Sequence, residues 1–300
     1  MTLAQLKEAL ATVVVVPVTP FDDGTADFGT YAKLCTRLVD AGISVLTPNG
    51  NTGEFYALNA DEAKQATETA VKAAAGKARV LVGVGHDIGT AIQAARHAQA
   101  SGADMIMIHQ PVHPYISNEG WIDYHQQIAA AVPDRGVVLY LKNERITGAD
   151  IAELASRAPN VIGVKYGLRD ATPFAQLARD AGLDRFTWLA GAAELTAPAF
   201  WAVGARGFTS GLANVNPSLS LDLLHALQAS DFGTAMKLWE QARRFEELRL
   251  ARSSADNVSV VKEALGQLGL CTPDVRAPSR PLPQPVKDEI SGILRSWGMA

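Results

Sequence analysis

Eight short apolar runs follow one another along this chain of 300 residues, and each comes after a helical stretch and a turn. Short runs rich in β-branched residues and without polar alternation are typical of parallel strands buried on both faces. Glycine just past a helix supplies the left-handed residue that ends it, as in DAGIS and AVGARG. The runs occupy residues 13–18, 44–48, 79–85, 104–108, 136–141, 161–165, 187–191 and 207–211.

Eight strand–helix units spaced by roughly 25–30 residues predict an α/β fold, the (β/α)8 or TIM barrel. We expect a barrel core over residues 1–217. Residues 218–300 should add the last barrel helix and a C-terminal helical extension within the same domain. A doubly wound sheet would need a glycine-rich phosphate turn after its first strand, and TPFDDGT is not one. Within the extension we expect helices at 218–229, 231–250, 257–269 and 284–297, with a proline-rich loop at 277–285.

Composition and charge exclude several classes of partner. The net charge is −4, the charges are mixed and no basic stripe is present, which argues against nucleic acid. VVVVPV is too short to span a membrane, and the N-terminus lacks the apolar centre of a signal peptide. We therefore expect a cytoplasmic protein in which Cys35 and Cys271 are free thiols. Nothing in the sequence indicates a cofactor.

Catalytic residues of a TIM barrel lie where its strands end, so Lys165 at the end of VIGVK is the first candidate. A strand-end lysine is ordinarily a solvated charge. Burial in the barrel mouth would instead lower its pKa and leave a neutral amine, which can attack a ketone to form a Schiff base. Tyr140 ends the preceding strand and can relay protons to such an amine.

Two more cations follow Tyr140. Lys142 is expected on the same face of the strand, as a rival nucleophile or as a second cation that depresses the pKa of Lys165. Arg145 follows in the loop, where a guanidinium can bind a carboxylate through two hydrogen bonds. The alternative is a surface arginine without a function.

The sequence NGNTGE after the second run indicates an anion site. Gly50 and Gly53 allow backbone N–H groups to turn inward, and Asn51 and Thr52 add polar side chains. Such a nest suits a carboxylate, although a plain strand–helix turn has a similar composition.

HQPVH places His109 and His113 four residues apart without a helix to bring them onto one face. A zinc pair would need a third ligand, and none follows at metal spacing. We therefore expect polar loop histidines and no metal, with His113 as a candidate proton carrier.

Four motifs in this order and spacing resemble those of the dihydrodipicolinate synthase/N-acetylneuraminate lyase family of class I aldolases. They are VPVTPF in the first strand, the loop GNTGEF, the tyrosine strand VVLY and the lysine strand VIGVK. The resemblance covers essentially the whole chain. It implies a TIM barrel with Schiff-base chemistry on a 2-oxo acid such as pyruvate.

The resemblance assigns the imine-forming lysine to Lys165 and the strand-five tyrosine to Tyr140. Backbone N–H groups around Asn51 and Thr52 would bind the carboxylate of the pyruvyl group. Arg145 would bind the carboxylate of a second substrate, as in the synthase branch.

Departures from the family pattern argue against dihydrodipicolinate synthesis. The usual YN[VIT]P is YLKN, which adds Lys142, and Asn51 replaces the first hydroxyl residue of the loop. The second relay tyrosine, which a neighbouring subunit donates in the synthase, aligns with His113, and Tyr115 can substitute only in part.

The stretches GNTGEFYAL, IGVKYGLRD and NVSVVKEAL followed by VRAP are closer to the 5-dehydro-4-deoxyglucarate dehydratase branch. A sugar acid needs polar groups for its hydroxyls as well as an imine. Strand-end and loop residues that can line such a site are Asn51, His113, Lys142, Arg145, Gly191, Thr209 and Ser210.

We therefore expect a class I lyase, favoured as a 5-dehydro-4-deoxyglucarate dehydratase. A dihydrodipicolinate synthase or another pyruvate-dependent aldolase is the alternative enzyme. A barrel that binds a 2-oxo acid or sugar acid without converting it is the alternative from another class. The resemblance also implies a homotetramer built as a dimer of dimers.

Overall fold

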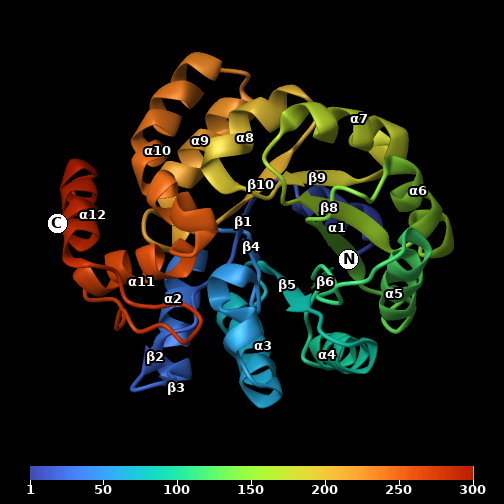
Figure 1. Cartoon of the computed structure of the whole chain (residues 1–300), viewed down its shortest axis with the longest axis horizontal. Helices are drawn as coiled ribbons and strands as arrows, with labels where there is room; N and C mark the ends of the chain where they lie inside the picture. The colour runs from blue at the N-terminus through green and yellow to red at the C-terminus, as the bar shows by residue number, and fades with distance from the viewer. Residues whose placement is uncertain (300) are drawn as a thin grey trace.

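The chain folds into a closed barrel of eight parallel strands surrounded by helices (Figure 1). This computed structural model describes residues 1–299. The barrel order is β1-β10-β9-β8-β7-β6-β5-β4, and β1 pairs with β4 to close it. All eight strands lie within or at most one residue beyond the predicted runs, so the TIM-barrel prediction is confirmed. They are β1 (Val13–Val15), β4 (Val45–Leu46), β5 (Arg79–Val84), β6 (Met105–Ile108), β7 (Gly136–Leu141), β8 (Val161–Tyr166), β9 (Thr187–Ala190) and β10 (Gly207–Ser210).

Each barrel strand is followed by a helix on the outside of the barrel. Most of these helices begin at an Asp, Asn, Ser or Thr whose side chain accepts a backbone N–H of the first turn, a contact that stabilises a helix by about 1 kcal/mol. The helices are α2 (Phe28–Asp40), α3 (Ala60–Ala74), α4 (Ile88–Ala100), α5 (Asn118–Ala130), α6 (Gly148–Arg157), α7 (Ala171–Ala181), α8 (Ala193–Ala202) and α9 (Pro217–Gln228).

The short helix α1 (Leu3–Ala9) covers the amino end of the strands, opposite the expected site. Leu6 and Leu10 are buried there with inward-facing strand residues such as Leu81 and Ile162. Burying an aliphatic side chain of this size contributes roughly 1.5–3 kcal/mol, so α1 closes one end of the barrel with apolar contacts. The carboxyl ends of the strands are left to form the site.

Three helices make up the C-terminal extension: α10 (Phe232–Ser254), α11 (Asn257–Gln267) and α12 (Gln284–Ser296). They lie together on one side of the barrel (Figure 1) and share a second apolar core with it, which includes Val18, Phe245, Leu265 and Ile290. The helices predicted at 257–269 and 284–297 agree with α11 and α12 to within two residues.

Helix α10 loses its regular geometry at residues 251–253, close to the predicted end at 250. Ala251 is extended, and Arg252 and Ser253 are left-handed, with φ of 51° and 58°. The two-residue strands β2 (Phe21–Asp22) and β3 (Thr25–Ala26) form a hairpin that the sequence did not predict, since each is too short to show an alternating pattern. Among the described helices, none combines the length and the apolar character needed to cross a bilayer.

Candidate active site

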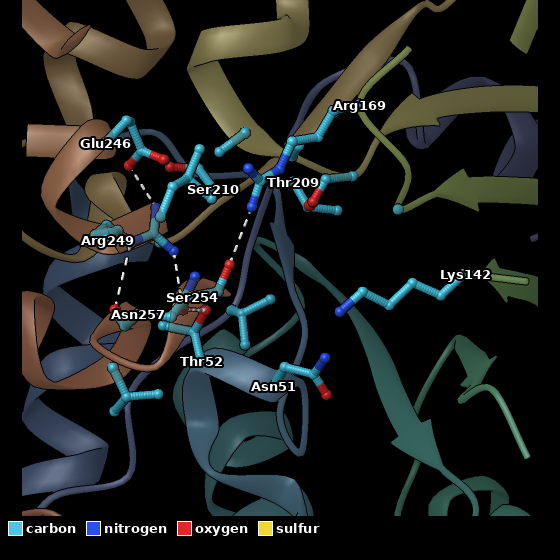
Figure 2. Close-up of a pocket in the computed structure, with 18 of the residues that line it drawn as sticks. Asn51, Thr52, Lys142, Arg169, Thr209, Ser210, Glu246, Arg249, Ser254 and Asn257 are labelled. Carbon is cyan, nitrogen blue, oxygen red and sulfur yellow. Dashed lines mark hydrogen bonds and ion pairs between the residues drawn. The ribbon is translucent and has the colours of Figure 1, made fainter. Parts of the chain in front are cut away.

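A cavity of about 600 Å³ opens at the carboxyl ends of the strands, where the chemistry of a TIM barrel is expected. Its walls come from loops after β1, β4 and β7 to β10, and from the junction of α10 and α11. Figure 2 shows Lys142 entering from one side and a polar group around Arg249 on the other. Of the predicted residues, the cavity is lined by Asn51, Thr52, Tyr140, Lys142, Lys165, Gly191, Thr209 and Ser210.

Lys165 and Tyr140 are paired in register on the neighbouring strands β8 and β7. The Lys165 side chain is buried, and its Nζ lies 4.3 Å from the centroid of the Tyr140 ring. Burial lowers the pKa of Lys165 to about 7, and the positive charges of Lys142 and Arg249 add to this effect. A sizeable fraction of the amine is therefore neutral near pH 7. A Cβ at position 167 would lie 2.7 Å from the Tyr140 ring, so Gly167 keeps the space beside this pair open.

The hydroxyl of Tyr140 accepts a hydrogen bond of 3.3 Å from the Asn51 side-chain amide. Burial raises the pKa of Tyr140 to about 12, so the phenol is protonated at neutral pH. Asn51 thus holds the phenol in position from the loop after β4. A protonated, oriented phenol beside a neutral amine has the chemistry needed to pass protons during imine formation.

The loop after β4 forms a short 3₁₀ helix at Asn51–Gly53. Within it, the Gly53 N–H is bonded to the Gly50 carbonyl, and neither glycine lines the cavity. Their role is close packing, because a Cβ at Gly50 would lie 2.6 Å from Val16 and one at Gly53 2.9 Å from the Pro17 carbonyl. The inward side of the loop is therefore formed by Asn51 and Thr52.

The end of β10 and the loop after β9 form the floor beside Lys165. The Ser210 hydroxyl donates to buried Glu194 at 2.6 Å, and the Thr209 hydroxyl donates to the Gly191 carbonyl at 3.3 Å. Gly191 has no room for a side chain, since a Cβ would lie 2.5 Å from the Tyr166 carbonyl oxygen. The two hydroxyls line the cavity but already have partners in the protein.

Arg145 and His113 lie outside the cavity of the single chain. Both are exposed, and His113 Nδ1 accepts a hydrogen bond from the backbone N–H of Tyr115. Their predicted substrate contacts are therefore not formed within one chain.

The hypothetical zinc pair is not assembled. His109 is fully buried, contacts the Asn49 carbonyl at 2.8 Å and stacks on Phe55, whereas His113 faces its own loop. Burial lowers the pKa of His109 to about 3. Over residues 1–299 the structure brings together no cluster of three or more His, Cys, Asp or Glu suited to a metal ion.

The model of the dihydrodipicolinate synthetase family matches residues 9–296. The chain belongs to this family. It is therefore an enzyme of the lyase type, which agrees with the family resemblance of its motifs and with the barrel.

Similar proteins in this family differ in their named activities. The 5-dehydro-4-deoxyglucarate dehydratase of Pseudomonas putida is 32% identical over 94% of each chain. A 4-hydroxy-tetrahydrodipicolinate synthase of Sphingopyxis alaskensis is 33% identical over 94% of this chain and 97% of its own. The crystal structure of dihydrodipicolinate synthase from Oceanobacillus iheyensis superposes with a TM-score of 0.94 at 36% identity and covers 99% of this chain and 100% of its own.

Sequence reasoning missed the part of the site in this family member that comes from the C-terminal extension. Buried Arg249 of α10 lines the cavity and is ion-paired with buried Glu246. Asn257 at the start of α11 accepts hydrogen bonds from Arg249 and from Thr52. No strand-end position marks these residues, because they lie on helices beyond the barrel. Arg169 also lines the cavity and was missed as well, although it lies only three residues after β8 in YGLRD.

Proposed function

We propose that this protein is a Schiff-base-forming lyase that acts on a 2-oxo acid, with Lys165 as the nucleophile and Tyr140 as the proton relay. The observation that carries the proposal is the Lys165 amine, buried over the Tyr140 ring with its pKa lowered to about 7. Burial in the mouth of the barrel disfavours the charged form of the lysine and so lowers its pKa. The neutral amine that results is the nucleophile.

In the proposed reaction the neutral Lys165 amine attacks the C2 ketone of the substrate, whose carboxylate rests against Asn51 and Thr52. The carbonyl oxygen leaves as water after receiving protons, and a protonated imine remains on Lys165. Tyr140 passes these protons through its hydroxyl.

The protonated imine then withdraws electrons from C3. Loss of a C3 proton gives an enamine, which expels the C4 hydroxyl as water in a dehydration. Cleavage of the C3–C4 bond is the alternative, and it releases an aldehyde in a retro-aldol reaction. Hydrolysis of the final imine consumes one water and restores the Lys165 amine.

We favour dehydration of 5-dehydro-4-deoxyglucarate followed by decarboxylation as the specific reaction. After the C4 hydroxyl has left, the unsaturated iminium accepts the electrons of the C5–C6 bond, the far carboxylate leaves as CO2, and the resulting C5 enol becomes an aldehyde. Its support is the similarity to the Pseudomonas putida dehydratase and the large polar cavity, which suits a hydroxylated acid. Dihydrodipicolinate synthesis is the second candidate, because synthases of similar identity are among the relatives. Asn51 in place of a hydroxyl residue, and an exposed Arg145, speak against it.

Borohydride trapping tests the chemistry. We expect incubation with pyruvate and borohydride to add the mass of a reduced pyruvyl group to the peptide that contains Lys165. Lys165→Arg should give no adduct, while Lys142→Arg should still be labelled at Lys165. A labelled Lys142 in the wild-type protein would overturn the assignment of the nucleophile, and the absence of any adduct would favour a binding barrel.

A panel of substrates then identifies the reaction. The panel contains 5-dehydro-4-deoxyglucarate, other 2-oxo sugar acids, and pyruvate with aspartate semialdehyde. We expect 2-oxoglutarate semialdehyde and CO2 from the first compound, because loss of water alone leaves six carbons and this product has five. Release of pyruvate from a sugar acid would indicate an aldolase instead.

We also propose a homotetramer. The loop after β6 exposes Val112 (63%) and Tyr115 (87%), two large apolar side chains that a subunit contact would cover. Light scattering should give four times the mass of one chain. A monomer at working concentration would contradict this assembly, and with it any role for His113 in a neighbouring site.

A further inference from the structure

The cavity carries more positive charge than one substrate carboxylate requires. Its lining includes the cations Lys142, Arg169 and Arg249 in addition to Lys165, and one carboxylate, Glu246. Burial raises the pKa of Glu246 to about 7, which further reduces the negative charge available to balance them. A cavity of about 600 Å³ is also far larger than a three-carbon acid needs.

Arg249 is fixed in a defined orientation within this wall. The residue is only 3% exposed, and its guanidinium is bonded to Glu246 and to both the side chain and the backbone carbonyl of Asn257. A Cβ at Gly211 would lie 2.2 Å from the Arg249 guanidinium, so a larger residue there would displace the guanidinium from this position. These contacts use three of its five N–H donors, which leaves two for a ligand.

Arg169 approaches the same region from the loop after β8. Its guanidinium donates to the Ser254 hydroxyl at 3.1 Å, across the mouth of the cavity. Ser254 belongs to the distorted end of α10, where it adopts a left-handed φ of 69°. Figure 2 shows Arg169, Ser254, Arg249 and Asn257 gathered on the wall that faces Lys142.

The start of α11 adds a second source of positive potential. Asn257 and Val258, the first residues of this 11-residue helix, line the cavity, and no side chain caps the helix. Backbone N–H groups of a first helical turn favour an anion. The two arginines and this helix start therefore converge on one part of the wall.

We propose that Arg249 and Arg169 form a second carboxylate subsite, which binds the far carboxylate of a dicarboxylic 2-oxo acid such as the substrate favoured above. This inference rests on the proposed function, which places the 2-oxo end on Lys165 and the loop at Asn51–Thr52. The far carboxylate is then bound by residues of the C-terminal extension and of the loop after β8. It is not bound by Arg145, which lies outside the cavity.

The test compares two six-carbon ligands that differ in one end group, 2-oxoadipate and 2-oxohexanoate. Each is titrated in the presence of borohydride, and the concentration that labels half of Lys165 is measured. A charge-assisted contact of the second carboxylate should lower this concentration about tenfold or more for 2-oxoadipate. Arg169→Gln and Arg249→Lys should each reduce that ratio by at least about threefold.

Two variants serve as comparisons. Arg96→Gln removes an exposed charge from the outer helix α4 and should keep the wild-type ratio, as should Arg145→Gln. Arg169 is exposed, so its substitution tests the subsite even if Arg249→Lys fails to fold.

A ratio near one in the wild-type protein would overturn the subsite alone. A ratio that falls only in Arg145→Gln would do the same, whereas no adduct with any 2-oxo acid would remove the proposed function as well.

Discussion

Lys142 and Lys165 share one cavity, and the charge of Lys142 adds to burial in lowering the pKa of the Lys165 amine to about 7. The second lysine, which breaks the family pattern in the strand-five loop, therefore acts on the first through space. It is exposed to solvent, so its effect is partly screened.

Replacing Lys142 should move the pH dependence of imine formation. Lys142→Met removes a like charge, so the protonated form of Lys165 becomes more favourable and its pKa rises. We expect the midpoint of pyruvate trapping to shift to higher pH by less than about one unit. Lys142→Arg keeps the charge and should keep the midpoint. A midpoint unchanged in Lys142→Met would show that burial alone sets this pKa.

The buried amine should also make stability depend on pH. In the unfolded chain the lysine binds its proton up to about pH 10.4, whereas in the folded protein it releases it near 7. Between these two pH values the unfolded state binds more protons than the folded state. The contribution of Lys165 to the free energy of unfolding therefore rises with pH, by at most about 1.4 kcal/mol per pH unit. At pH 7 and below, the protein bears the full cost of burying the amine.

Lys165→Met should therefore unfold at a higher denaturant concentration than the wild-type protein at pH 7. The difference should shrink at pH 8 and again at pH 9. Urea unfolding at the three pH values measures it, and other titrating groups cancel in the comparison. A pH-independent difference would mean that Lys165 is protonated in the folded protein throughout this range.

Tyr140→Phe should separate catalysis from packing. The ring remains over Lys165, so the melting temperature should change little, but the hydroxyl that we propose as the proton relay is lost. We expect the rate of imine formation at saturating pyruvate to fall by about 10²–10⁴-fold. Asn51→Ala keeps the phenol and removes only its hydrogen-bond donor, so its loss should be smaller. A wild-type rate in Tyr140→Phe would exclude the relay.

The barrel and its central pair of residues were predictable because they depend on local patterns. Buried parallel strands appear as continuous apolar runs, and Tyr140 and Lys165 lie at the ends of two such runs. Strand order makes β7 and β8 neighbours, and their register, which shifts at Val137/Val138, places the two residues side by side. Predictions tied to the loop 109–115 and to Arg145 did not lead to the cavity, since loop direction is not encoded in such patterns.

The wall made by Arg249, Glu246 and Asn257 was beyond sequence reasoning for a different reason. These residues lie on helices, where a charged side chain usually faces solvent. The burial of Arg249 and Glu246 depends on how the extension packs against the barrel, far along the chain from the Thr52 loop. The same tertiary packing gives a role to Glu54, the last residue of NGNTGE, for which the sequence alone predicts none.

Glu54 and Lys262 form a buried ion pair that connects the loop after β4 to α11. Their charged atoms lie 2.5 Å apart with both side chains almost fully buried, and Lys262 also contacts the Asp274 carbonyl at 2.7 Å. Removing one member should leave the other charge buried without an opposite charge beside it. Glu54→Gln and Lys262→Met should each lower the free energy of unfolding by about 3–5 kcal/mol.

The double variant should be less damaging than the sum of the two single variants, because it leaves no unpaired buried charge. We expect an interaction energy of about 0.5–3 kcal/mol from urea unfolding of the four proteins. The exposed pair Lys64–Asp61 is the matched control, and Lys64→Met should cost less than about 1 kcal/mol. Additive effects of Glu54→Gln and Lys262→Met would contradict a direct pairing. Coupling of the expected size would mean that the extension holds the loop bearing Asn51 and Thr52 in place. The helices that supply Arg249 would then also position the proposed site for the first carboxylate.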